Sequence, residues 1–174
     1  MTSRRYLGPL VIIIAGAIIL YIYLGVGASI FGANVEVGVY PGNAALDFSF
    51  TDFNGKSYRL SDFRGKVVLL EFMTSWCPAC KVEHGHIERL YETYRDGDLV
   101  IITISIENNF DDAKRFWVEN NVEWIMTWNM SLASLYGVYY IPTIIIIDRD
   151  GVIRFRDEGI VTYEELSALI DQYL

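Results

Sequence analysis

The sequence has few cysteines and few basic side chains for its length. Only two of its 174 residues are cysteine, so a framework of several disulfides is excluded. Cys77 and Cys80 are so close in sequence that a bond between them would restrain the unfolded chain little, because the entropic stabilisation grows with loop length. Lysine and arginine number 14 against 22 acidic residues, so nucleic acid is not an expected partner. A chemically reactive pair explains these cysteines better than a structural bridge.

Charged residues are also missing from a long stretch near the N-terminus. The range 7–30 contains none, and about 20 apolar residues are enough to cross a bilayer core. Arg4 and Arg5 precede it and no acidic residue appears before Glu36, so residues 1–6 are expected in the cytoplasm and the rest outside. We therefore predict a single-pass anchor in the cell membrane. A cleaved signal peptide is the alternative, although its apolar core usually has only 7 to 15 residues.

The remaining sequence divides into a short linker and one domain. The range 31–45 has glycine and proline but no periodic apolar pattern, which is typical of a linker, and 46–174 has the length of one domain. The expected strands are 47–50, 57–60, 67–73, 99–106, 124–128, 143–148 and 152–155, and the expected helices are 78–95, 111–120, 131–136 and 163–173. This order mixes parallel crossovers with an antiparallel edge. It predicts an α/β fold in which helices cover both faces of a central mixed sheet.

Cys77 is expected where the buried strand 67–73 ends and a helix begins. Its sulfur would face unpaired backbone N–H groups and the positive end of the helix dipole, which favours the thiolate. Thiols so placed in Cys-X-X-Cys motifs have pKa values of about 3.5 to 7.5, and the thiolate is the attacking form. Cys80, one turn further along, would be shielded and would resolve a mixed disulfide by attacking Cys77. Pro78 suits the first helical turn, where its missing N–H costs nothing.

Five segments of the domain carry a family resemblance. They are Asp47-Phe-Ser-Phe-Thr-Asp-Phe-Asn-Gly-Lys56, Leu60-Ser-Asp-Phe-Arg-Gly-Lys-Val-Val-Leu-Leu70, Trp76-Cys-Pro-Ala-Cys80, Tyr136-Gly-Val138 and Ile141-Pro-Thr-Ile-Ile-Ile-Ile-Asp148. Together they resemble the TlpA/ResA group of thioredoxin-like proteins, over roughly residues 44–173. The resemblance implies a thioredoxin-like fold and a membrane-anchored reductant of protein disulfides, including that of apocytochrome c before haem attachment. The redox-active cysteine pair is then the reactive group, and no further cofactor is expected.

The resemblance also implies which residues bind substrate: Trp76, Pro78, Ile141 and Pro142. Pro142 matches the family's cis-proline, which lies against the cysteine pair and lets the backbone of Ile141 bond an extended substrate segment. An ordinary strand start is the alternative for Pro142, because only about 5 to 6% of X-Pro bonds in folded proteins are cis. Trp76 is expected to cover the disulfide and contact substrate, or else simply to pack at a strand end. Because Pro78-Ala79 differs from the Gly-Pro and Glu-Pro pairs of the family, the resemblance implies no reduction potential.

Two carboxyl groups are further catalytic candidates. Glu71 stands six residues before Cys77 in an otherwise apolar strand, where thioredoxin itself has a buried acid. Burial of an isolated carboxylate is costly, so a raised pKa and proton transfer to or from Cys80 are expected; a partly solvated strand end is the alternative. Glu83, three residues after Cys80, matches a carboxylate that the TlpA/ResA group uses beside the active site, although it also fits a solvated helix position.

Metal binding is a rival function, because Cys77, Cys80 and His84 have the spacing Cys-x2-Cys-x3-His and His86 follows. A structural zinc site usually has four close ligands, and the apolar strands already supply a core. We therefore expect both histidines to face solvent on the helix rather than to hold zinc or copper.

Peroxide reduction is a second rival, because peroxiredoxins share the wider fold and Thr74 precedes Cys77 by three residues. The proline of the Pro-x3-Thr-x2-Cys motif is missing, however, and Leu70 occupies its place. We therefore favour a thiol-disulfide oxidoreductase acting outside the cytoplasm. Protein disulfides are its expected substrates, and a membrane electron-donor protein is an expected partner, since the pair must be kept reduced there.

Overall fold

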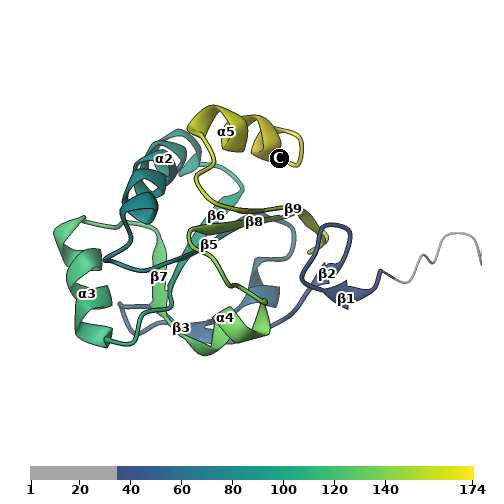
Figure 1. The fold of residues 1–174 in the computed structure, drawn as a ribbon. Coiled ribbons are helices and arrows are strands. Elements are labelled where there is room, and N and C mark those ends of the chain that lie inside the picture. The colour runs from purple at the N-terminus through teal and green to yellow at the C-terminus, as the bar shows by residue number, and fades with distance from the viewer. Residues whose placement is uncertain (1–34) are drawn as a thin grey trace, which may run out of the picture. The chain divides into compact units, whose positions relative to one another are not determined.

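Seven consecutive buried residues form the strand on which the domain is built. This strand, β5 (Val67–Met73), is apolar except for Glu71, as expected for a strand that is covered on both faces. Its neighbours in the sheet are β6 (Leu99–Ser105) and β8 (Thr143–Ile147), which are also rich in buried isoleucine. The computed structural model describes residues 35–174, and these strands lie at its centre (Figure 1).

The sheet has five strands in the order β7-β6-β5-β8-β9. β5 pairs in parallel with β6, and β6 in parallel with β7 (Ile125–Trp128). β8 pairs antiparallel with β5 and with β9 (Ile153–Glu158). The predicted central mixed sheet is confirmed, and so is the hairpin that joins its last two strands.

Helices cover both faces of the sheet, as predicted. On one face, a single apolar cluster joins alternate residues of β5 to α2 (Pro78–Tyr94), α3 (Phe110–Glu119) and α5 (Tyr163–Asp171). Because successive side chains of a strand point to opposite faces, Glu71 shares the α2 face with Leu69 and Met73. The acid of β5 and both cysteines therefore belong to the same layer of the fold.

The other face of β5 packs against shorter elements. They are α4 (Ser131–Leu135), the 3-10 turn η1 (Leu60–Phe63) and the antiparallel hairpin of β3 (Ser49–Thr51) and β4 (Ser57–Arg59). Val68, Leu70 and Phe72 are the β5 residues in this second cluster. Every side chain of β5 thus packs into one layer or the other.

The domain begins earlier than the sequence suggests. Residues 35–45, predicted as the end of a linker, form the paired strands β1 (Val37–Gly38) and β2 (Ala44–Ala45). Backbone hydrogen bonds also tie this segment to the start of β9: Gly42 N–H donates to Ile153 O over 2.8 Å and Ala45 N–H to Gly151 O over 2.9 Å. The boundary predicted at 46 therefore lies within the domain. No periodic side-chain pattern marks this segment, because the hydrogen bonds that hold it use backbone atoms.

The predicted anchor at 7–30 lies outside the described residues. Within 35–174, no helix is long and apolar enough to cross a membrane.

Burial of Tyr136 gives a direct test of how the second cluster is held. Tyr136 is fully buried, and its hydroxyl donates a 2.6 Å hydrogen bond to the carbonyl oxygen of Leu46. Tyr136→Phe is predicted to lower the free energy of unfolding by about 1 kcal/mol, because that carbonyl loses its partner. Urea unfolding measures the change. The matched control is Tyr139→Phe, at a side chain that is 85% exposed, and an equal loss there would contradict the prediction.

Candidate active site

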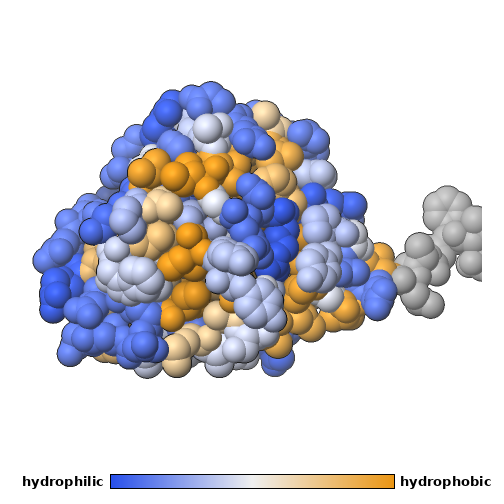
Figure 2. Space-filling model, viewed as in Figure 1, coloured by the Kyte–Doolittle hydropathy of each residue, from blue (hydrophilic) through white to orange (hydrophobic). Residues whose placement is uncertain are grey.

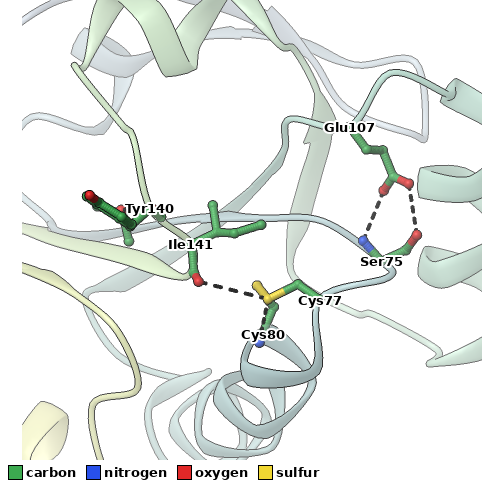
Figure 3. Close-up of a disulfide and its surroundings, with 7 residues drawn as sticks. Ser75, Cys77, Cys80, Glu107, Tyr140 and Ile141 are labelled. Carbon is green, nitrogen blue, oxygen red and sulfur yellow. Dashed lines mark hydrogen bonds between the residues drawn. A yellow bond between two sulfur atoms is a disulfide. The ribbon is translucent and has the colours of Figure 1, made fainter.

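The end of β5 and the start of α2 bring the two cysteines together. Cys77 is the residue that caps the N-terminus of α2, and Pro78 occupies the first turn as predicted. Cys77 and Cys80 form a disulfide with their Cα atoms 5.3 Å apart. The backbone N–H of Cys80 points at Cys77 Sγ over 3.1 Å, as Figure 3 shows. A backbone donor that has no partner within the helix therefore lies where a thiolate on Cys77 needs stabilisation.

The two sulfurs differ in their access to solvent. Cys80 is completely buried, whereas Cys77 retains 5% of its surface. The geometry is therefore consistent with the predicted order of attack by the two cysteines. Cys77 meets a substrate sulfur first, and Cys80 is reached only by Cys77.

The loop before β8 lies against the disulfide. The Ile141–Pro142 peptide bond is cis, as the family resemblance implies. The carbonyl oxygen of Ile141 lies 3.9 Å from Cys77 Sγ (Figure 3). On its other side the loop is held by two hydrogen bonds: Thr143 Oγ1 donates to Tyr140 O over 2.6 Å, and Gly159 N–H donates to Pro142 O over 2.8 Å.

Large aromatic side chains near the disulfide are exposed. Trp76, immediately before Cys77, is 68% exposed, and Tyr139 and Tyr140 of the cis-proline loop are exposed as well. Figure 2 shows hydrophobic residues reaching the surface at several places on this face, one of them between α2 and α4. Trp76 is therefore free to contact a substrate. It does not pack in the interior, which was its alternative role.

Glu71 is fully buried beside the cysteine layer. Thr103 Oγ1 donates a 2.7 Å hydrogen bond to Glu71 Oε2, while Oε1 has no hydrogen-bond partner among the described residues. Burial raises the pKa of Glu71 to about 8, against the opposing effect of the Thr103 hydrogen bond and with a smaller raising effect from Glu83. The solvated strand end that was the alternative is excluded, and the carboxyl group can exchange a proton near neutral pH.

Glu83 is the second buried carboxyl group, on α2. The backbone N–H of Val161 donates to Glu83 Oε2 over 2.9 Å, and Oε1 is again without a partner among the described residues. Burial raises its pKa to about 7, the Val161 hydrogen bond lowers it, and Asp157 raises it further. The structure thus excludes a solvated helix position for Glu83 and places an acid on α2 as well as on β5.

The prediction that both histidines face solvent is wrong for His84. This side chain is buried, with its ring against Phe116 and Trp124 at centroid distances of 5.0 and 5.2 Å. Burial lowers its pKa, and Glu88 opposes that effect. His86 is partly exposed, with Nδ1 2.9 Å from Val161 O. His84 points into the layer between α2 and α3 because i and i+4 positions share a helix face, here with the fully buried Cys80.

No group of three or more histidine, cysteine or acidic side chains in residues 35–174 is arranged to hold a metal ion. In this oxidised form, the sulfurs of Cys77 and Cys80 are bonded to each other.

Sequence reasoning missed Glu107, which fixes the loop before Cys77. Its carboxylate accepts hydrogen bonds from Ser75 N–H and Ser75 Oγ at 3.1 and 2.8 Å (Figure 3). Ser105 Oγ also donates to it, over 2.8 Å. Glu107 follows β6, the parallel neighbour of β5, and the carboxyl ends of such strands lie side by side. That placement was the available signal: a polar residue just past β6 is a neighbour of the residues just past β5.

A pocket of about 560 Å³ adjoins Trp76 between α2 and α3. Its lining includes Lys81, His84, Arg115 and Phe116.

Fold and site together define a class of protein. A mixed sheet with a Cys-X-X-Cys disulfide at the start of the helix after its central strand, facing a cis-proline, is the arrangement of a thioredoxin-like thiol-disulfide oxidoreductase. The chain belongs to the AhpC/TSA family, whose model matches residues 41–156, and to the ResA-like thiol-disulfide oxidoreductases.

Known relatives agree with this assignment. The chain is 31% identical to the thiol-disulfide oxidoreductase ResA of Bacillus thuringiensis over 127 residues, which cover 72% of this chain and 73% of the relative. It is 31% identical to the thioredoxin-like protein YneN of Bacillus subtilis over 140 residues, 78% of this chain and 82% of the relative. Among solved structures, a thiol:disulfide interchange protein DsbE from Chlorobium tepidum matches with a TM-score of 0.72 and 26% identity, covering 78% of this chain and 99% of that one.

The buried carboxyl of Glu71 makes stability depend on pH. Its pKa is raised in the folded state, so its contribution to stability is complete below its unfolded pKa of about 4.3 and is lost as pH rises to about 8. Glu71→Gln is predicted to gain Tm relative to the unsubstituted oxidised protein by on the order of 10 °C between pH 5 and pH 9. About three pH units of the difference between the two pKa values fall in this window, which is ~4 kcal/mol, and ~1 kcal/mol corresponds to ~2–4 °C. Calorimetry at both pH values checks this. Glu88→Gln, at an exposed acid of α2, is the control, and a constant difference for Glu71→Gln would show that its carboxyl does not titrate as described.

Proposed function

We propose that this thiol-disulfide oxidoreductase works as a reductant of protein disulfides outside the cytoplasm. The observation that carries the proposal is the asymmetry of the pair. Cys77, at a helix start, keeps 5% of its surface exposed, and Cys80 is completely buried in a layer that holds two buried acids. A site that only docked partners would need neither the reactive thiol nor the buried carboxyl groups.

In the proposed reaction, the Cys77 thiolate attacks one sulfur of a substrate disulfide. The Cys80 N–H, 3.1 Å from Sγ, stabilises the negative charge before attack. The substrate S–S bond breaks and its far sulfur leaves as a thiol or thiolate, so Cys77 is joined to the substrate. The exposed Trp76, which precedes Cys77 in the chain, and the backbone of Ile141, 3.9 Å from Cys77 Sγ, hold the substrate chain.

Resolution requires Cys80 to lose a proton within the apolar layer. Glu71 and Glu83 have raised pKa values, so each can take up or release a proton near neutral pH. Cys80 then attacks Cys77 Sγ, the mixed disulfide breaks, and the substrate leaves with its second thiol. The protein is left as the disulfide seen in the structure and needs two electrons for the next cycle, which we assign to a membrane electron-donor protein.

Separate substitution of the two cysteines tests this scheme. Cys77→Ser is predicted to abolish reduction of a protein disulfide such as that of insulin. Cys80→Ser is predicted to accumulate a covalent mixed disulfide, visible as a dithiothreitol-sensitive adduct by mass spectrometry, because the resolving thiol is gone. Reduction by Cys77→Ser at the unsubstituted rate would contradict the proposal. Consumption of hydrogen peroxide that depends on Cys77, with dithiothreitol as the reductant, would favour the peroxidase alternative.

Apocytochrome c is the substrate that the TlpA/ResA resemblance suggests, and we include it in the proposal. Its haem-attachment disulfide must be reduced after export. A strain without the protein is expected to lose covalent cytochrome c, and added dithiothreitol is expected to restore it if disulfide reduction is the missing step.

We further propose that residues 7–30 anchor the protein in the cell membrane with the catalytic domain outside. The uncharged stretch behind Arg4 and Arg5 supports this. The prediction is that alkaline carbonate leaves the protein in the membrane fraction and that external protease degrades the domain in intact protoplasts. A variant without residues 1–30 is the control; protection from protease would contradict the orientation.

A further inference from the structure

Two hydrogen bonds in series connect an indole to the buried carboxyl of Glu71. Trp124 Nε1 lies 2.9 Å from Thr103 Oγ1, and Thr103 Oγ1 lies 2.7 Å from Glu71 Oε2. Thr103 is the residue directly opposite Glu71 in the pairing of β5 with β6, and Trp124 immediately precedes β7, the next strand of the sheet. All three side chains are buried, so water does not compete for these bonds.

The chemistry of the indole fixes the direction of both bonds. An indole N–H is a donor only, so Thr103 Oγ1 must accept from Trp124. The hydroxyl hydrogen of Thr103 is then available to Glu71 Oε2, its one other partner among the described residues. If Thr103 instead accepted from a protonated Glu71 as well, its own hydrogen would lie in the interior without an acceptor, which is costly.

The direction of the bonds distinguishes the two oxygens of Glu71. Oε2 accepts from Thr103, so a proton on the carboxyl group belongs on Oε1, which has no hydrogen-bond partner in residues 35–174. Glu71 lies on the face of β5 that packs against the layer of Cys77 and Cys80. Resting on the proton-transfer role assigned to Glu71 above, we propose that Trp124 and Thr103 are positioning residues that make Oε1 the proton-exchanging atom and favour the carboxylate form.

The proposed step balances as follows. The proton of Cys80 Sγ moves to Glu71 Oε1 as Sγ bonds to Cys77 Sγ, and the bond between Cys77 and the substrate sulfur breaks with its electron pair leaving on the substrate. Thr103 keeps its hydrogen throughout, because Oε2 remains an acceptor in both protonation states. Trp124 never exchanges a proton and acts only by occupying the acceptor side of Thr103.

Other titratable groups surround this chain of hydrogen bonds and need separate control. On α2 they are the two cysteines, Glu83 and His84, and Tyr91 lies with His84 against the Trp124 ring. From β8, Ile144 pairs with Glu71 and brings no charge. Glu83 raises the pKa of Glu71, whereas the Thr103 hydrogen bond lowers it. In the oxidised protein the cysteines do not titrate, so the carboxyl groups can be followed without them.

The test is the titration of the Glu71 side-chain carboxyl carbon by NMR in the oxidised full-length protein, with Glu71→Gln and Glu83→Gln used for assignment. Thr103→Val removes the donor and is predicted to move the Glu71 midpoint up by about one to two pH units, the size expected for a lost hydrogen bond to a charged group. Trp124→Phe frees Thr103 to accept from protonated Glu71, so a smaller upward shift is predicted. Thr103→Ser, which restores the hydroxyl, should return the midpoint to that of the unsubstituted chain.

Trp117→Phe is the matched control, because the Trp117 indole donates to a backbone carbonyl, that of Val122, over 3.1 Å. It should leave the Glu71 midpoint unchanged. The same shifts should appear in the pH profile of mixed-disulfide resolution and should vanish in a Glu71→Gln background, which a general loss of packing would not produce. Unchanged or lowered midpoints in both Thr103→Val and Trp124→Phe would overturn the proposal. Failure of the proposed function is seen separately, as disulfide reduction that survives Cys77→Ser.

Discussion

The burial of β5 on both faces is the constraint on which the rest of the structure depends. β5 is covered by α2 on one side and by α4 and η1 on the other. Beyond the carboxyl end of this strand, the chain enters α2 through Cys77. The reactive sulfur thereby sits between a rigid strand and unpaired helix donors. The same burial removes water from Glu71, so one strand supplies both the placement of the nucleophile and the raised pKa of an acid behind it.

The interior behind the disulfide combines apolar packing with a small set of directed polar contacts. Glu71 is held from β6 by Thr103, and Glu83 is held from the segment before α5 by the backbone of Val161. Each acid leaves one oxygen without a partner among the described residues. A buried oxygen without a hydrogen bond costs free energy, so its presence calls for an explanation such as a catalytic role. In the proposed reaction, these two acids from different elements accept and return the proton of Cys80.

Much of this arrangement could be predicted from local sequence patterns. The strand 67–73, the helix start at Cys77 and the mixed sheet follow from apolar periodicity and turn residues, and the family motifs indicated the cis bond at Pro142. Glu71 stood out because a charged residue in an apolar strand must be explained. These features depend on a few adjacent residues or on a motif, which is the information that a single sequence carries most directly.

The features that sequence reasoning missed depend on partners far apart in the chain. Glu107 is 32 residues from Ser75, and the Trp124 indole meets Thr103 21 residues away. His84 was placed in solvent because the packing of α3 against α2 is not encoded in the helix containing it. Residues 35–45 were taken for a linker because their pairing with β9 uses backbone atoms, which leave no side-chain pattern.

The central claim is that the Cys77–Cys80 pair is a reductant of protein disulfides. Its most direct test is the equilibrium reduction potential of the pair in the full-length protein, titrated against glutathione and dithiothreitol buffers. The account predicts a value near that of thioredoxin, about −270 mV, which is low enough to reduce substrate disulfides when electrons are supplied. A value near −120 mV, as in a strong disulfide donor, would contradict it.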